Sequence, residues 1–194
     1  MLILYAVLLG FILGFASKGR LKYLPQRPLY WKLLALIAFI IQLVIFSELA
    51  FVKALPETTI VISHLISYIL LLTFVIRNIK NIGVTIIGAG IIMNSLVIFL
   101  NGGYMPTIPE NLEKTSLGAA AGLINQGQAV NNSSKLTGDT LLPWLGDIFY
   151  LPHWVPLSNV FSIGDIVVAV GICIYIVMNM HPLPHCKTNN NAKI

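Results

Sequence analysis

Five long apolar runs dominate this 194-residue chain, and they leave few folds open to it. A helix needs about 20 apolar residues to cross the roughly 30 Å hydrocarbon core of a bilayer. The runs are also apolar on all sides, whereas helices of a soluble bundle keep a polar face. The sequence therefore predicts an all-α membrane protein, a five-helix transmembrane bundle that forms one domain over residues 1–194. The expected spans cover residues 1–17, 29–51, 58–76, 82–100 and 165–180.

Composition supports this class and narrows the partners. Hydrophobic residues make up 57% of the chain and charged residues 10%, against about 25% charged residues in a soluble domain. The net charge of +5 is not a nucleic-acid signal, because no basic cluster alternates with aromatic residues. We expect the lipid bilayer as the main partner, no nucleic acid and no cofactor. Cys173 lies inside the last run and Cys186 in the tail, so a disulfide between them is not expected.

The basic residues predict the orientation in the membrane. Lys and Arg are enriched on cytoplasmic connectors, and one orientation places nine of the twelve on the same side. That orientation puts the N-terminus outside and the 181–194 tail in the cytoplasm. The first run has basic residues after it but none before it, unlike a cleaved signal peptide. The nine are Lys18, Arg20, Lys22, Arg27, Lys32, Arg77, Lys80, Lys187 and Lys193, and the other three are Lys53, Lys114 and Lys135.

One long polar stretch, residues 101–160, interrupts the apolar sequence. We expect it to lie in an extracytoplasmic loop over residues 101–164, since loops beyond about 12–15 residues usually serve a function or are disordered. Residues 116–130 suggest a short helix, and the aromatic residues of 141–161 favour the bilayer surface. Asp139, Asp147 and Asp165 each follow a glycine and precede apolar residues, a pattern typical of a helix N-cap.

Polar groups of four runs are expected in the outer half of the bilayer, where ionisable groups mark functional sites by default. We predict an outward-facing polar pocket covered by the loop. Its candidate ligand-binding residues are Glu48, His64, Ser67, Asn94, Asn101, Asp147 and Asp165. Structural roles compete with this hypothesis. His64 can be a hydrogen-bonded core residue, and Asp165 a helix cap. Asn94 can belong to a packing stripe with Gly83, Ile87, Gly90 and Asn101.

No catalytic or phosphate-binding motif accompanies these residues, and no ligand spacing predicts a metal site. The favoured function is a non-catalytic ligand-binding protein or accessory subunit, in a homo-oligomer or with a membrane partner protein. One alternative is a membrane-embedded enzyme acting on lipid or an envelope precursor, with His64, Asp147 and Asp165 as acid–base groups. Another is a small transporter or cation site that uses Glu48, Asn94 and Asp165.

Three short motifs carry a family resemblance. They are Asn101-Gly-Gly-Tyr-Met-Pro106, Leu145-Gly-Asp147 and Phe161-Ser-Ile-Gly-Asp165, behind four apolar runs. In this the chain resembles a family of small bacterial multi-pass membrane proteins of unknown function (the five-three-one-seven family). The resemblance implies a bacterial plasma-membrane location and assigns no catalytic residue.

Overall fold

The structure, a computed structural model, describes residues 2–26, 28–47 and 49–182, and it is mostly helical. By length and composition, α4 (Glu57–Arg77) and α5 (Ile82–Leu100) could each cross a membrane. Three further apolar helices are shorter: α1 (Leu2–Ala16), α2 (Lys32–Ile45) and α8 (Ile163–Asn179). The bounds of α5 agree with the expected run 82–100.

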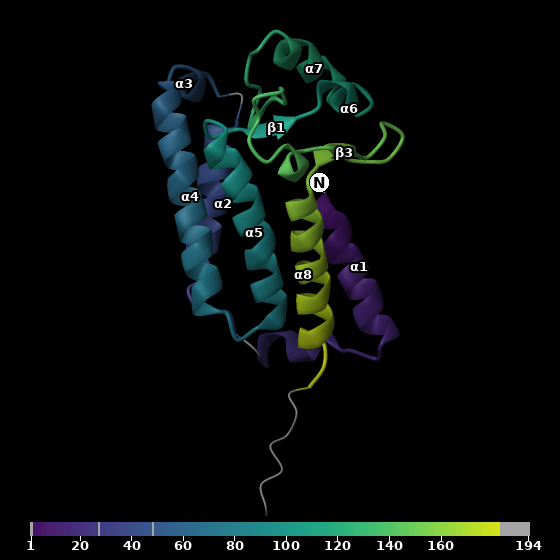
Figure 1. The fold of residues 1–194 in the computed structure, drawn as a ribbon. Helices are drawn as coiled ribbons and strands as arrows, with labels where there is room; N and C mark the ends of the chain where they lie inside the picture. The colour runs from purple at the N-terminus through teal and green to yellow at the C-terminus, as the bar shows by residue number, and fades with distance from the viewer. Residues whose placement is uncertain (1, 27, 48, 183–194) are drawn as a thin grey trace, which may run out of the picture.

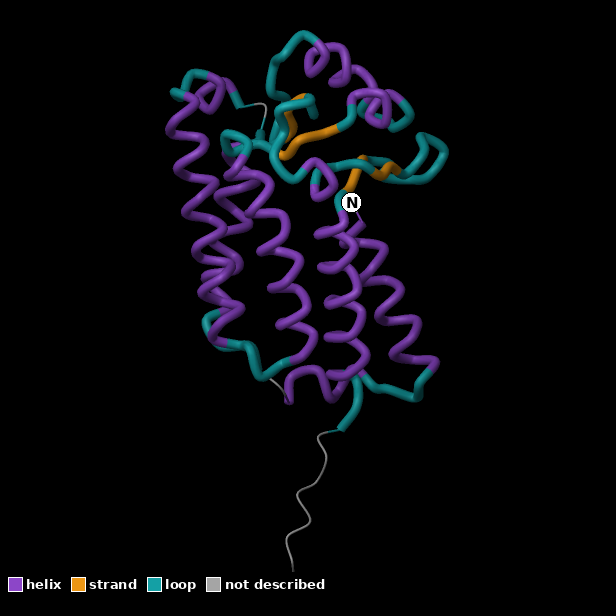
Figure 2. The backbone as a smooth tube through the Cα atoms, in the orientation of Figure 1, coloured by secondary structure: helices purple, strands orange, loops and turns teal. Residues whose placement is uncertain are grey.

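Four of these helices stand side by side in the order α1, α8, α5 and α4, and α2 packs against α4, behind the row in this view (Figure 1). The first and second helices of the chain therefore pack against different partners, α1 against α8 and α2 against α4. A 3-10 helix, η1 (Leu21–Gln26), runs between them and contacts α8. Residues 17–26, 28–31 and 77–82 lie at one end of the row, which we call the basic end. Residues 101–162 lie at the other, which we call the covered end (Figure 2).

Charge is divided between the two ends. The loops of the basic end carry Lys18, Arg20, Lys22, Arg77 and Lys80, and no Asp or Glu occurs in residues 1–47 or 58–109. The acidic residues that the structure describes all lie at the covered end: Glu57, Glu110, Glu113, Asp139, Asp147 and Asp165. These acidic residues and the basic residues of the basic end thus lie at opposite ends of the helices, although Lys114 and Lys135 also lie at the covered end.

The contact between α5 and α8 is the closest in the row. A Cβ atom on Gly90 would lie 2.5 Å from the carbonyl oxygen of Gly164, and one on Gly171 would lie 2.6 Å from the backbone nitrogen of Ile87. One on Gly83 would meet the backbone of Tyr175. The stripe predicted from the sequence is therefore a packing face, where glycine lets two backbones approach.

The other face of α8 packs on α1. Gly10 lies against Ile176 and Cys173, and Gly14 against Met180. The Cys173 thiol also donates a hydrogen bond to the carbonyl oxygen of Ala6, with 3.1 Å between the atoms. Gly10 and Gly14, one turn apart on α1, thus serve helix packing.

Residues 101–162, which we call the covering segment, contain secondary structure of their own. Strands β1 (Met105–Thr107) and β2 (Ser133–Lys135) pair in parallel, and β3 (Phe149–Tyr150) and β4 (Val160–Phe161) pair antiparallel. The helices α6 (Pro109–Glu113) and α7 (Gly118–Asn125) and the 3-10 helix η2 (Pro143–Leu145) complete it. Leu112, Ala121, Ile124 and Val160 form a small core there. The chain is therefore mostly helical rather than all-α.

The structure corrects the expected span over residues 29–51. There α2 begins only at Lys32, after Trp31 in the left-handed conformation (φ 54°), and ends at Ile45. A separate short helix, α3 (Ala50–Lys53), follows. The break has a local cause, because the Ser47 hydroxyl donates to the carbonyl oxygen of Val44 and so competes with helical hydrogen bonds.

None of the three aspartates expected as N-caps is one. Asp139 lies in a turn, and Asp147 pairs with Thr107 in an isolated parallel bridge. The third Gly-Asp pair does begin a helix, but the N-cap of α8 is Ser162. Asp165 is the N3 residue of a capping box, in which each side chain accepts from the other residue's backbone N–H.

Replacing Gly90 with leucine should lower the free energy of unfolding by about 1–3 kcal/mol, because the new side chain would overlap the backbone of α8. Thermal unfolding of the purified protein measures the change. The matched control is Ala89→Leu, since Ala89 is the neighbouring residue on α5 and is exposed. Equal destabilisation by both variants would contradict the packing described here.

Candidate functional site

A network of three polar side chains joins α5 to the start of α8. The Asn94 amide nitrogen donates to Asp165 Oδ1 at 2.8 Å, and the Ser162 hydroxyl donates to Asn94 Oδ1 at 2.9 Å. The backbone N–H of Ser162 donates to Asp165 Oδ2 at 3.1 Å. Each oxygen of the Asp165 carboxylate thus has a donor. We call these three residues the Asn94 clasp.

The neighbouring glycine makes this network geometrically possible. A Cβ atom on Gly164 would lie 2.0 Å from Asn94 Oδ1, far inside van der Waals contact. Asn94 is 9% exposed and Ser162 is fully buried. Hydrogen bonds inside a poorly hydrated bundle commonly join helices. The clasp therefore has a structural role, because it joins α5 to α8.

Asp147 lies near this network and is the least satisfied acid of the described residues. Its side chain is 7% exposed, and its Oδ1 atom is buried without a hydrogen-bond partner. Burial, and then the negative charge of Asp165, raise its pKa well above the ordinary value. The backbone N–H of Asp147 donates to the carbonyl oxygen of Pro106 at 2.8 Å, which holds the residue in place. The fold therefore favours the protonated form of this carboxyl group.

His64 occupies an aromatic pocket on the α4 side. Its ring lies 4.7 Å from that of Phe46, 5.1 Å from that of Tyr68 and 5.6 Å from that of Phe99, measured between centroids. Nδ1 donates to the carbonyl oxygen of Gly103 at 3.0 Å, and the side chain is 2% exposed. His64 thus attaches α4 to the first turn of the covering segment.

Ser67 and Asn101 also have structural partners. The Ser67 hydroxyl donates to the carbonyl oxygen of His64 at 2.6 Å and accepts from the Gln42 amide at 2.9 Å, so it joins α4 to α2. The Asn101 side chain donates to the carbonyl oxygen of Leu141 at 2.9 Å and accepts from its N–H at 2.8 Å. Asn101 thereby fixes the far part of the covering segment to the end of α5.

The predicted residues form two groups instead of one. Asn94 and Asp165 are hydrogen-bonded, with Asp147 close enough to feel the charge of Asp165. His64 and Ser67 lie together on α4. Among the hydrogen bonds of the described residues, none joins His64 to either aspartate. Glu48 lies outside the described residues.

A pocket of about 740 Å³ opens at the covered end, between the α2–α4 side of the row and the covering segment. Of the described residues that line it, only Glu57 is charged. Polar groups come from Ser47, Tyr104, Gln128, Asn131 and Ser134. Burial and the adjacent Glu57 carboxylate raise the pKa of Tyr104, so this phenol stays protonated and can donate hydrogen bonds.

Sequence reasoning missed this pocket. None of the predicted residues that the structure describes lines it. Ser47, which does line the pocket, directly precedes the predicted residue Glu48, and Glu57 falls between the expected spans 29–51 and 58–76. A lone acid directly after a proline at the start of an apolar run was the one available signal. No three His, Cys, Asp or Glu residues of the described part of the chain are grouped so as to hold a metal ion.

Asp147→Asn should raise stability at neutral and alkaline pH. In the unfolded chain an aspartate ionises near a pKa of about 3.9. As the pH rises from about 4 toward the raised pKa of folded Asp147, only the unfolded state loses its proton, so stability falls. Asparagine removes this loss. The melting temperature of Asp147→Asn should therefore exceed that of the natural protein at pH 8 and approach it near pH 4.

The control for this measurement is Asp139→Asn, because Asp139 is exposed in a turn. It should leave the pH profile unchanged. A destabilised Asp147→Asn variant at pH 8 would contradict the assignment of a neutral buried acid.

Comparison with known proteins agrees with the sequence resemblance. Neither the curated proteins nor the solved structures include a significant match. The model of a family described as a family of unknown function, DUF5317, matches residues 26–177. That range includes α2, α4, α5, the covering segment and nearly all of α8, and with it all three motifs. The chain belongs to the DUF5317 family.

Proposed function

We propose that this is a five-span protein of the bacterial plasma membrane, with its covered end and N-terminus outside and its basic end in the cytoplasm. Large apolar side chains on all five helices support this. Ile12 of α1, Leu33 of α2 and Ile69 of α4 are 64%, 63% and 53% exposed, and Leu96 of α5 and Val170 of α8 are 48% and 47% exposed. Soluble monomers rarely expose apolar patches larger than a few hundred Å².

Two further observations favour the same arrangement. The basic end carries the excess of Lys and Arg that is typical of the cytoplasmic side. The helices α1, α2 and α8 have 15, 14 and 17 residues, or roughly 21–26 Å at 1.5 Å per residue. Local bilayer thinning and interfacial flanking residues accommodate such a mismatch at modest cost.

Within this membrane protein we propose a non-catalytic, ligand-binding role for the 740 Å³ pocket at the covered end. The observation that carries the proposal is the pocket itself, which has the size of a small-molecule site and a mixed lining. It lies between segments far apart in the sequence, at Glu57, Tyr104 and Gln128. The ligand would reach it from outside the cell.

The lining indicates the chemistry of the ligand. Glu57 supplies the only charge among the described lining residues, and amide and hydroxyl groups surround it. A negative carboxylate with nearby hydrogen-bonding groups favours a cation, such as a protonated amine, over an anion. Ile45, Leu55 and Ile60 add apolar contacts for a carbon skeleton.

The catalytic and transport alternatives receive less support from the geometry. Acid–base catalysis requires groups within hydrogen-bond reach of one another or of a substrate. His64 instead bonds to Gly103, and Asp165 to its own helix start and Asn94. A transported cation that moved from Asn94 toward the basic end would have to pass the close contact between α5 and α8.

The proposed topology predicts which ends react with a membrane-impermeant maleimide. In a Cys173→Ala, Cys186→Ser background, Gln128→Cys should be labelled in intact cells, because Gln128 is exposed and lines the pocket. Lys80→Cys at the basic end should be labelled only after permeabilisation. If Lys80→Cys is labelled in intact cells and Gln128→Cys is not, the topology is the opposite of the one proposed.

The proposed ligand class predicts selective stabilisation. Spermidine and ethanolamine, as protonated-amine probes, should raise the melting temperature of the purified protein, whereas acetate and phosphate should not. Glu57→Gln should abolish the increase, because it removes the charge of the pocket. Glu110→Gln, an exposed acid outside the lining, is the control and should respond like the natural protein. An undiminished response in Glu57→Gln would refute the assignment.

A further inference from the structure

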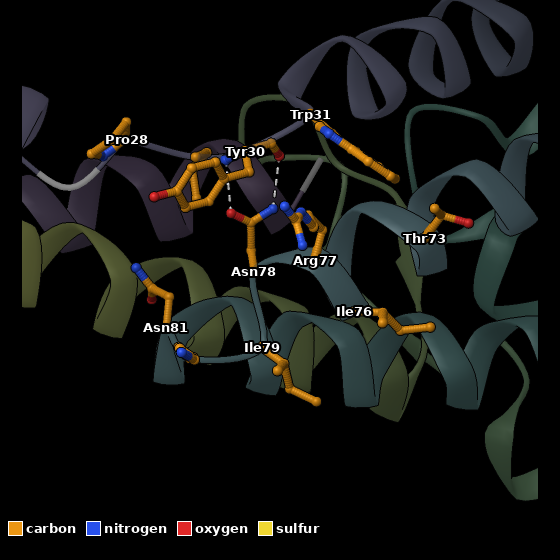
Figure 3. A pocket seen from close by; sticks show the side chains of 11 residues that line it. Pro28, Tyr30, Trp31, Thr73, Ile76, Arg77, Asn78, Ile79 and Asn81 are labelled. Atoms are coloured by element: carbon orange, nitrogen blue, oxygen red, sulfur yellow. Dashed lines mark hydrogen bonds between the residues drawn. The ribbon is translucent and has the colours of Figure 1, made fainter.

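A second pocket, of about 650 Å³, lies at the basic end. One wall comes from residues 28–31 before α2, and the other from the end of α4 and the turn to α5, residues 73–81. Figure 3 shows Tyr30, Trp31 and Arg77 grouped on one side, with Ile76 near the end of α4 and Ile79 in the turn after it. None of these residues takes part in the site at the covered end.

Asn78 builds this pocket by fixing the chain at Tyr30. Its Oδ1 accepts from the N–H of Tyr30 at 2.9 Å, and its amide donates to the carbonyl oxygen of Tyr30 at 2.8 Å (Figure 3). Asn78 is 6% exposed. The next residue, Trp31, has φ 54°, a left-handed conformation that costs a bulky residue on the order of 1–2 kcal/mol. Strain of this kind persists where the surroundings hold it, and it is concentrated at functional sites.

Arg77 gives the pocket its charge. Its guanidinium lies 5.8 Å from the centroid of the Tyr30 ring and 5.3 Å from that of the Trp31 ring. At these distances the two rings attract the cation electrostatically, and guanidinium N–H groups are donors that bind phosphate in pairs. Lys80 also lines the pocket, and none of the lining residues that the structure describes is acidic. The nearest acid along α4 is Glu57, about 30 Å away at 1.5 Å per residue.

The same pocket has an apolar margin. Ile76 is 68% exposed, Ile79 58% and Trp31 56%. A ligand that matches both features has an anionic phosphate for Arg77 and Lys80 and a hydrocarbon chain beside the isoleucines. Basic pockets between helices on the cytoplasmic side commonly hold anionic lipid head groups.

We propose that this pocket binds the phosphate head group of an anionic phospholipid from the cytoplasmic leaflet. The proposal rests on the membrane location and topology proposed above, but not on the ligand of the covered end. Arg77 and Lys80 bind the phosphate, Tyr30 and Trp31 hold Arg77 in place, and Ile76 and Ile79 contact the acyl chain.

Native mass spectrometry of the full chain in detergent tests the proposal, with phosphatidylglycerol and phosphatidylcholine of the same acyl chains as probes. The natural protein should retain phosphatidylglycerol more tightly than phosphatidylcholine. Arg77→Gln should weaken binding of phosphatidylglycerol about tenfold or more, the usual effect of losing a charge-assisted hydrogen bond. Arg20→Gln is the matched control, because Arg20 carries the same charge at the same end and lies outside the pocket. It should bind like the natural protein.

Three results would overturn the lipid site. Equal losses in Arg77→Gln and Arg20→Gln would mean that only the general charge of the basic end matters. Equal retention of the two lipids would remove the role of the anionic head group. Displacement of phosphatidylglycerol by glycerol 3-phosphate at equal concentration would assign the pocket to a soluble phosphate. If maleimide labelling agrees with the topology while any of these occurs, the lipid site alone fails.

Discussion

The close contact between α5 and α8 is the constraint on which the rest of the structure depends. Two helices separated by more than sixty residues approach so closely that Gly90, Gly164 and Gly171 have no room for a side chain. At the covered end of this contact, Asn94 joins Ser162 and Asp165 by hydrogen bonds. The segment between the two helices must therefore start and finish at neighbouring points, and it folds over the row instead of extending away from it.

This arrangement explains why the polar groups at the covered end serve two purposes. Beside α8, the hydrogen-bonding capacity of Asn94 and Asp165 is used within the fold, and Asp147 is buried nearby, where burial and the charge of Asp165 raise its pKa. On the α2–α4 side, α2 stops at Ile45 and leaves space below the covering segment. The open pocket forms there, with Glu57 as its charge. The basic end has the complementary arrangement, with cations held by aromatic rings and no acid in its loops.

Local patterns predicted local features of this fold. The run that became α5 is apolar between Asn81 and Asn101, so its bounds were readable, and its glycines at helical spacing indicated a packing face. Asp147 shows where such reasoning stops. A Gly-Asp pair before apolar residues is a cap signal, but pairing with Thr107, forty residues earlier, places this aspartate in a bridge instead. The pocket was equally hidden, because Glu57, Tyr104 and Gln128 meet only through the tertiary fold.

The Asn94 clasp joins α5 to the start of α8, at the point where the covering segment ends. A double-mutant cycle of Asn94→Ala and Asp165→Ala measures this link, with the free energy of unfolding determined in detergent. The cycle separates the clasp from the capping role of Asp165, which Asp165→Ala also removes. A coupling energy of about 1 kcal/mol or more is the predicted result, as expected for a hydrogen bond to a charged group. Effects that add within about 0.3 kcal/mol would show that the two side chains act independently and would contradict the account.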